Sequence, residues 1–419
     1  MRHSGTLGKR RGVAVAAAAV AATVAVGLAV PALAARTQSA KLQPATVSRV
    51  LGPGQVGLRA AVPWRRVGPG WSLALYSAGH GVGVIKPKDG PSTVYLVDPS
   101  GGRYRIITWP AHSAQTLWYL VAWSGDGRRA MFVPAIELYG PREQVFQLQL
   151  RTGKVTSFRL PKNVLAVGYT RPDGLNILAE RGANIGPTAR GTLMRFSLTG
   201  HLLKTLATVR GDRIQIPGEE GAHLGEAAYQ PAGAELAVGG TNGIVLVGNA
   251  GGVIKRLPVP GVNQGCAAVR WWTAQTVLAS CSTSTDPGPR LWLVPANGSQ
   301  PEALTPARTG QTFDIGDFNA WQLSSGRYVN GYGACGTLVI GKQPTHGPEQ
   351  MVNVPGSVSS LVVNATRTRL QIERINECSP GVSLVWFNPV TRAMTVAIPL
   401  GRNQDGVVAV VPYFVTGKF

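Results

Sequence analysis

The sequence predicts an all-β protein that folds as a single β-propeller of seven four-stranded blades. Three observations support this fold class. The 419 residues include 53 Gly and 30 Pro, which favours many short strands and turns over long helices. Two turn motifs alternate along the chain at nearly even intervals. Several apolar runs, such as LWYLVAW at 117–123, are continuous rather than alternating, as expected for strands buried on both faces.

The N-terminal segment, residues 1–34, is expected to be a signal peptide. A basic stretch precedes the apolar run 13–30, and Ala32 and Ala34 occupy the two small-residue positions of an A-x-A cleavage site. Cleavage is expected after Ala34. The apolar run is also just long enough to span a bilayer, so an uncleaved anchor is the alternative. Residues 35–54 then form a polar lead-in, and the propeller is expected over 55–414.

The first repeated motif is an aromatic residue, a tight polar turn and a short apolar strand. WSGDGRRAMF (123–132) shows it most clearly, and the stretches at 169–179 and 229–238 are close copies. Asp-Gly in such a turn supplies the positive φ that tight hairpins require. Another copy comes earlier, at 68–75. The later copies, at 271–280, 321–331 and 363–372, are degenerate and lack the turn Asp.

The second repeated motif is a strand, a turn that usually contains Gly, and another strand. Its seven copies place their turns near positions 102, 153, 200, 251, 298, 347 and 391, between 44 and 51 residues apart. Each unit therefore holds two hairpins, and four antiparallel strands at this period are typical of a propeller blade. Seven blades are preferred over six or eight.

The way in which the ring closes is left open by the sequence. GVVAVVPYF (406–414) has the composition of another inner strand after the seventh blade, whereas VGLRAAVPW (56–64) resembles an inner strand of the first blade. The C-terminal strand therefore either enters the first blade or caps the last one from outside.

The stretch WSGDGRRAMF resembles the W-S-P-D-G-K-x-L-A-F core of the TolB-like propeller repeat, which also occurs in the propellers of prolyl oligopeptidase-type enzymes. The resemblance covers roughly residues 55–400. It implies a bacterial exported scaffold in which the aromatic of the repeat packs between blades, and it transfers no catalytic residue. The G-x-S-x-G elbow of the associated hydrolases does not occur in this sequence.

The charge of the chain favours anionic partners. The net charge is +21, and residues 1–34 carry four of the 41 basic residues and none of the 20 acidic ones, so the remainder has a net charge of +17. For an exported protein such an excess points to envelope polymers or lipid head groups rather than nucleic acid. Diffuse surface Arg in a basic proteome is the alternative explanation.

The sequence offers few residues for catalysis or for a metal or cofactor site. No two His residues after the leader have metal-ligand spacing. Asp314 and Asp317, in FDIGDFN, precede the inner strand of the sixth blade and are the best acidic pair for a ligand at the channel mouth. Loop capping is their alternative role. Trp123, Trp271 and Trp321 occupy the packing position of the repeat, whereas Trp64 and Trp71 are less constrained.

The four cysteines are predicted to form two disulfides, Cys266–Cys281 and Cys335–Cys378. An even number in an exported chain favours pairing over four buried free thiols. With a hairpin loop at 272–275, Cys266 and Cys281 lie directly opposite each other on neighbouring strands. Cys335 and Cys378 follow the second strands of the sixth and seventh blades, so their bridge would join adjacent blades. The two closed loops predict about 3 and 4 kcal/mol of stabilisation.

The sequence thus favours an exported, non-catalytic scaffold that binds a protein or an anionic polymer of the cell envelope. The alternatives are a propeller-type lyase or glycoside hydrolase, or a small-ligand sensor, with the site at the central channel. No cofactor, no nucleic-acid partner and no transmembrane segment after signal cleavage are expected. The location is secreted or envelope-associated, and the oligomeric state is left open.

Overall fold

A computed structural model describes twelve segments of the chain. They are residues 50–78, 90–110, 118–134, 144–181, 190–210, 229–283, 288–306, 316–333, 337–343, 349–375, 382–401 and 405–413. The chain divides into two units, Met1–Val47 and Ser48–Phe419, and all described residues lie in the second. The expected signal peptide therefore lies outside the described residues.

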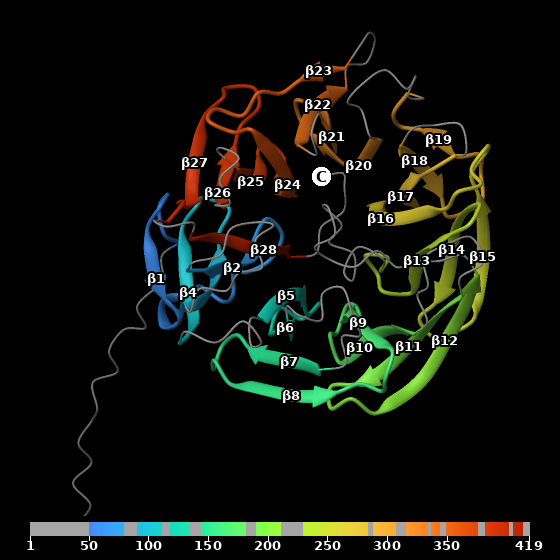
Figure 1. The fold of residues 1–419 in the computed structure, drawn as a ribbon, viewed down its shortest axis with the longest axis horizontal. Helices are drawn as coiled ribbons and strands as arrows, with labels where there is room; N and C mark the ends of the chain where they lie inside the picture. The colour runs from blue at the N-terminus through green and yellow to red at the C-terminus, as the bar shows by residue number, and fades with distance from the viewer. Residues whose placement is uncertain are drawn as a thin grey trace, which may run out of the picture. The chain divides into compact units, whose positions relative to one another are not determined.

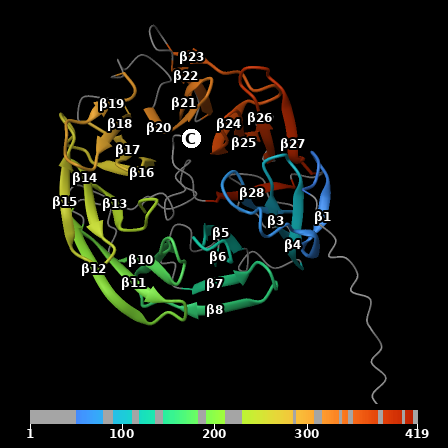
Figure 2. The same ribbon diagram turned by 180° about the vertical axis from the view of Figure 1, so that it is seen from behind.

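The described residues form seven separate sheets that follow one another around a ring (Figure 1, Figure 2). We number them as blades 1–7 in chain order. In this part of the chain the one helix is a single 3-10 turn, η1 (Arg59–Ala61). The all-β, seven-bladed prediction is confirmed.

The strands of each blade are given from the centre of the ring outward. Blade 1 contains β28 (Gly406–Pro412), β2 (Ser72–Ser77), β3 (Ser92–Val97), β4 (Arg103–Trp109) and β1 (Val56–Leu58). Blade 2 contains β5 (Trp118–Trp123), β6 (Arg129–Pro134), β7 (Gln144–Gln149) and β8 (Val155–Arg159). Blade 3 contains β9 (Val164–Tyr169), β10 (Asn176–Arg181), β11 (Arg190–Ser197) and β12 (Leu202–Arg210).

The remaining four blades follow the same order. Blade 4 contains β13 (Glu235–Gly240), β14 (Gly243–Gly248) and β15 (Val253–Pro258). Blade 5 contains β16 (Cys266–Thr273), β17 (Thr276–Cys281), β18 (Arg290–Pro295) and β19 (Glu302–Ala303). Blade 6 contains β20 (Gly316–Leu323), β21 (Gly326–Tyr332), β22 (Leu338–Gln343) and β23 (Gln350–Met351). Blade 7 contains β24 (Ser359–Ala365), β25 (Leu370–Ile375), β26 (Val382–Phe387) and β27 (Met394–Ile398).

Two blades depart from four strands. In blade 4, a single bridge between Tyr229 and Leu236 is what the described residues show of an innermost strand. Blade 1 has five strands, because β1 adds to its outer edge in parallel with β4. The expectation that 56–64 supplies an inner strand of blade 1 is therefore wrong.

The ring closes through the C-terminal strand. β28 pairs antiparallel with β2, from Ser72 opposite Pro412 to Ser77 opposite Gly406, and is the innermost strand of blade 1. Of the two alternatives, entry of this strand into the first blade is correct. With the inner position filled by β28, residues 56–58 are left at the rim.

The hydrophobic core consists of layers between adjacent blades rather than one central mass. We call each layer a joint. Among the described residues every pair of neighbouring blades has its own buried cluster, including one between blades 7 and 1. Trp123, Trp271 and Trp321 are fully buried in these joints, as the repeat predicted. Trp71 is 3% exposed, so its interpretation as a less constrained residue is wrong.

The innermost strands share a β-bulge. In six blades one residue of this strand has no partner on the next strand, and the equivalent residues are Val408, Val121, Val167, Val269, Phe318 and Val363. A bulge breaks the period of two along a strand. The continuous apolar runs of the sequence therefore reflect an inserted residue as well as burial on both faces.

One side of the ring carries short turns between the first and second strands of the blades. We call it the turn face. Its described turns join β5 to β6, β9 to β10, β16 to β17, β20 to β21 and β24 to β25. In blades 2 and 3 the Asp of the repeat stabilises the turn: Ser124 Oγ donates to Asp126 Oδ1 at 2.6 Å, and Leu175 N donates to Asp173 Oδ1 at 3.0 Å.

Candidate functional site

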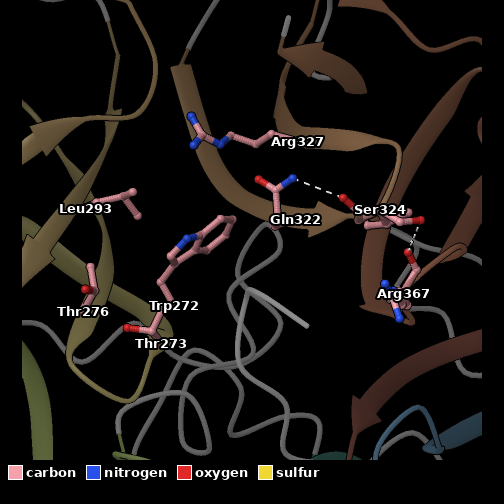
Figure 3. A pocket seen from close by; sticks show the side chains of 9 residues that line it. Trp272, Thr273, Thr276, Leu293, Gln322, Ser324, Arg327 and Arg367 are labelled. Atoms are coloured by element: carbon pink, nitrogen blue, oxygen red, sulfur yellow. Dashed lines mark hydrogen bonds between the residues drawn. The ribbon is translucent and has the colours of Figure 1, made fainter. Parts of the chain in front are cut away.

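An open pocket of about 680 Å³ lies on the turn face where blades 5, 6 and 7 meet (Figure 3). We call it the turn-face pocket. It is bordered by the β16–β17 turn of blade 5, the β20–β21 turn of blade 6 and the β24–β25 turn of blade 7. These are the three turns in which the sequence repeat is degenerate. None of these three turns contains Asp, and the turn of blade 4 (QPAGA, 230–234), which does not border the pocket, also lacks it.

Blade 5 contributes an indole and two threonines to the turn-face pocket. Thr273 and Thr276 flank a two-residue turn, and the register of β16 shifts between Trp271 and Thr273, so Trp272 has no partner on β17. This second bulge is what places Trp272 at the pocket (Figure 3). Because its side chain is 4% exposed, Trp272 mainly forms a rigid wall.

Blades 6 and 7 are held together beneath the pocket by hydrogen bonds between their turns. Ser324 donates to the carbonyl oxygen of Arg367 twice, from its backbone N at 2.9 Å and from Oγ at 3.1 Å. Gln322 Nε2 donates to the carbonyl oxygen of Leu323 at 3.1 Å. These bonds fix the backbone from which Gln322 and Arg367 project (Figure 3).

Two guanidinium groups supply the charge of the turn-face pocket. Arg327, on β21, is partly buried, and its Nε has no hydrogen-bond partner among the described residues. Burial lowers the pKa of Arg327, and the Glu302 carboxylate acts in the opposite direction. Arg367 is exposed. None of the nine lining residues is acidic. With hydroxyl, amide and indole groups beside them, two guanidinium groups suit an anionic ligand.

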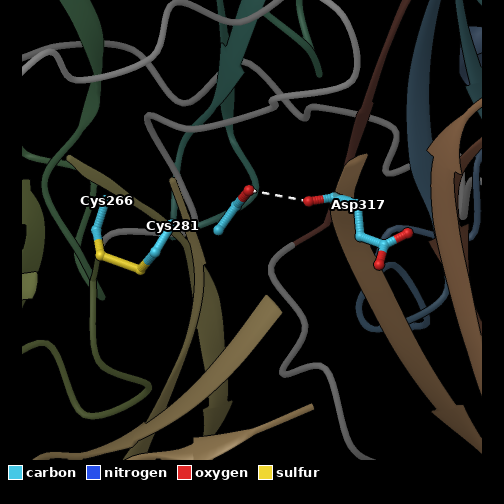
Figure 4. The surroundings of a disulfide bond; sticks show 4 residues. Cys266, Cys281 and Asp317 are labelled. Carbon is cyan, nitrogen blue, oxygen red and sulfur yellow. Dashed lines mark hydrogen bonds between the residues drawn. A yellow bond between two sulfur atoms is a disulfide. The ribbon is translucent and has the colours of Figure 1, made fainter. Parts of the chain in front are cut away.

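The predicted acidic pair lies apart from the turn-face pocket. Asp317 is the second residue of β20, at the opposite end of the strand from the β20–β21 turn, and is 1% exposed. Ser280 Oγ donates to its backbone oxygen at 3.0 Å, which links blade 5 to blade 6 (Figure 4). Asp314 lies outside the described residues. Ligand binding by this pair remains a prediction.

One of the two predicted disulfides is present. Cys266, the first residue of β16, is bonded to Cys281, the last residue of β17, and their Cα atoms are 4.0 Å apart (Figure 4). The two residues are directly opposite, as predicted. The loop expected at 272–275 is wrong, because the turn has two residues and the bulges at Val269 and Trp272 make up the difference. Cys335 and Cys378 lie outside the described residues.

The residues of the turn-face pocket were not identified from the sequence. The available signal was negative. The fifth to seventh copies of the repeat lose the turn Asp, and Trp272, Gln322 and Arg327 all lie within two or three residues of those turns. This signal is not specific, because the fourth copy of the repeat, at 229–238, also lacks the turn Asp and does not border the pocket.

In the described part of the chain, no helix has the length and apolar character needed to cross a membrane. Nor do these residues gather three or more His, Cys, Asp or Glu side chains into a group suited to a metal ion.

Comparison with known proteins finds similarity in solved structures alone. No family model and no curated protein matches the chain. TolB from Acinetobacter baumannii is similar with 12% identity and a TM-score of 0.43, over 82% of this chain and 66% of that one. A puromycin-hydrolyzing peptidase from Mycobacterium tuberculosis has 14% identity and a TM-score of 0.48, over 83% and 56%.

The β-propeller domain of the Trilobed protease from Pyrococcus furiosus is similar with 10% identity and a TM-score of 0.47, over 78% of this chain and 94% of that domain. The chain thus spans about half the length of the peptidase and just under two thirds of TolB. The fold assignment rests on the strand order and ring closure of this chain itself.

Proposed function

We propose that this protein is an exported, non-catalytic propeller scaffold that binds an anionic partner of the cell envelope, a protein or a polymer, at the turn-face pocket. The observation that carries the proposal is the pairing of Arg327 and Arg367 in a pocket whose nine lining residues include no acid. A partner with carboxylate or phosphate groups would gain charge-assisted hydrogen bonds there.

Two further features support this proposal. The chain after residue 34 has a net charge of +17, which would draw an anionic partner to the surface before specific contacts form. The pocket is framed by turns from three blades, and Ser324 fixes two of them to each other through the Arg367 carbonyl. A rigid frame lowers the entropic cost of binding. Export itself follows from the predicted signal peptide at 1–34.

An affinity capture experiment tests the proposal. Purified protein is immobilised and exposed to an envelope extract, and bound material is compared between wild type and Arg327→Gln/Arg367→Gln. The control Arg159→Gln/Lys162→Gln removes the same charge from exposed positions at the end of blade 2. We expect the pocket variant to lose at least about tenfold of the captured partner, since each charge-assisted bond contributes about 1.5–3 kcal/mol.

The outcomes separate the proposal from its alternatives. Equal capture by the wild type and the pocket variant would contradict it. Equal loss in the pocket variant and in the control would show attraction to net charge without a site. Turnover of polysaccharide or peptide substrates, abolished by changing Asp317, would favour the enzymatic alternative at the channel instead.

A further inference from the structure

A second open pocket, also of about 680 Å³, lies at the outer rim of blade 1. We call it the rim pocket. It is bordered by η1 and the residues around it, by residues 105–108 of β4, and by the turn between β7 and β8 of blade 2. It shares no lining residue with the turn-face pocket.

Three guanidinium groups from three separate elements converge at the rim pocket. Arg59 begins η1, Arg105 lies on β4, and Arg151 precedes β8. The parallel pairing of β1 with β4 sets Leu58 opposite Arg105, which brings Arg59 beside that strand. The charges are thus gathered by strand pairing and not by proximity in sequence.

Arg59 is held in place by the backbone around it. Its Nη1 donates to the carbonyl oxygen of Ile106 at 3.3 Å. It also reaches blade 2, because a Cβ atom added to Gly153 would lie 1.7 Å from Arg59 Nη1. A glycine in that turn is what lets the guanidinium approach. Arg105 and Arg151 are exposed, so one fixed and two adjustable cations share the pocket.

Trp64 gives the rim pocket an apolar wall. Its side chain is partly exposed, and Arg151 Cζ lies 5.6 Å from the centre of its ring. None of the lining residues is acidic, and the chain contains no Asp or Glu before Asp89. Three like charges repel one another, and a bound anion would relieve that repulsion.

We propose that the rim pocket binds an oxyanion, a phosphate or carboxylate group, carried on a sugar or a similar ring that packs against Trp64. Guanidinium groups present paired N–H donors that match two oxygens of such a group. Arg59 supplies a preorganised donor set, and Arg105 and Arg151 close on the ligand from β4 and from blade 2. This site is additional to the turn-face pocket and does not depend on the function proposed for it.

Calorimetric titration tests this inference with defined probes. Glucose 6-phosphate and glucuronate carry the two oxyanions on one ring type, and glucose is the uncharged control. Two variants of the full chain, Arg59→Gln/Arg105→Gln and Arg105→Gln/Arg151→Gln, remove charge from the pocket. The second changes exposed residues alone, so it keeps the test valid if the first fails to fold. The control Arg159→Gln/Lys162→Gln removes equal charge outside the pocket.

We expect wild type to bind at least one charged sugar and not glucose. Both pocket variants should bind it at least about tenfold more weakly, and the control less than about twofold. The tighter of the two sugars identifies phosphate or carboxylate as the preferred group. Absence of binding to both charged sugars, or equal weakening in the control, would overturn the inference. Retained binding by Arg327→Gln/Arg367→Gln would show that this site acts independently of the turn-face pocket.

Discussion

The joint between blades 1 and 2 and the joint between blades 5 and 6 connect similar sheets by different means. Among the described residues the first has sixteen buried apolar residues and the second has seven. At the position that follows the bulge, blade 1 carries Ala409, which packs in the apolar layer, and blade 5 carries Arg270. The same bulged backbone therefore accommodates either an apolar or a charged side chain at this position.

The joint between blades 5 and 6, which we call the ionic joint, is built around the buried guanidinium group of Arg270. Arg270 Nη2 donates to Asn319 Oδ1 at 2.6 Å, and Arg270 Cζ lies 3.4 Å from the centre of the Trp321 ring. Burial lowers the pKa of Arg270 to about 9. The turn-face pocket opens beside this joint, and Trp272 and Leu293 belong to both. The thinner apolar layer thus lies beside the turn-face pocket.

The largest expected loss of stability is in the joint between blades 1 and 2, which we call the apolar joint. Phe132 is 1% exposed and packs edge-on against Trp109 with ring centres 5.2 Å apart. Phe132→Ala should lower the free energy of unfolding by about 4 kcal/mol, because it removes buried surface and leaves a cavity. Leu278→Ala in the ionic joint should cost less, about 2–3 kcal/mol. Denaturant titration measures both. Because Leu278→Ala removes fewer atoms than Phe132→Ala, a loss for Leu278→Ala that equals or exceeds the loss for Phe132→Ala would show that the joint between blades 5 and 6 is not the more weakly packed one.

The disulfide joins β16 to β17 within blade 5, and its two cysteines are buried in the joint between blades 4 and 5. Cys266→Ala/Cys281→Ala should lower the free energy of unfolding by about 3 kcal/mol, the chain-entropy value for a loop of this length. Peptide mapping of this variant without reductant then shows whether the other two cysteines are bonded to each other. A linked peptide with Cys335 and Cys378 would confirm the predicted second bridge, and alkylation of both without reductant would contradict it.

Substitutions of Arg270 and of Asn319, the two hydrogen-bonded residues of the ionic joint, should change the free energy of unfolding by different amounts. Asn319→Ala leaves Arg270 buried without its acceptor and should cost about 2–3 kcal/mol. Arg270→Met removes the buried charge, while Asn319 Oδ1 still accepts from Ala320 N at 2.9 Å, so the cost should stay within about 1 kcal/mol. The double variant should recover most of the loss seen for Asn319→Ala. Additive losses in this cycle would show that the two residues do not act as a pair.

The smallest expected effect concerns the joint between blades 7 and 1. Burial raises the pKa of Glu373 to about 8 from 4.5. The folded protein therefore keeps this proton up to about pH 8, and the unfolded chain releases it near pH 4.5. The free energy of unfolding should fall between these pH values, by about 1–2 kcal/mol, since partial exposure of Glu373 reduces the full linkage effect. Glu373→Gln should remove this part of the pH profile, and an unchanged profile would contradict the assignment.

Features that depend on local pattern were predicted from the sequence. The turn spacing gave seven blades, the aromatic of the repeat identified Trp123, Trp271 and Trp321 as core, and the register of a hairpin paired Cys266 with Cys281. The register was right although the loop was wrong, because two unpaired residues in β16 compensate for a turn that is two residues shorter. The pairing of Cys266 with Cys281 is unchanged because the two unpaired residues and the shorter turn offset each other.

Features that depend on contacts between distant segments were not predicted. The burial of Trp71 depends on Tyr104, whose ring stacks on it with centres 5.9 Å apart, and on the closing strand β28. The turn-face pocket combines residues of blades 5, 6 and 7, and the rim pocket combines residues of blades 1 and 2. Neither Arg327 with Arg367 nor Arg59 with Arg151 is close in sequence, so no spacing rule connects them.

The pairing of β28 with β2 has a consequence for the timing of folding. About 330 residues separate the two strands, so β28 is synthesised long after β2. At about 5–20 residues per second, β2 waits roughly 20–70 s with its inner edge unpaired. During that interval the edge is open to association with other chains. The ring therefore closes only after β28 has been synthesised. A chain cut short before Gly406 would keep the buried residues of five joints, but it would lose Ala409 and Val411 from the joint between blades 1 and 2, and Val407 and Val410 from the joint between blades 7 and 1.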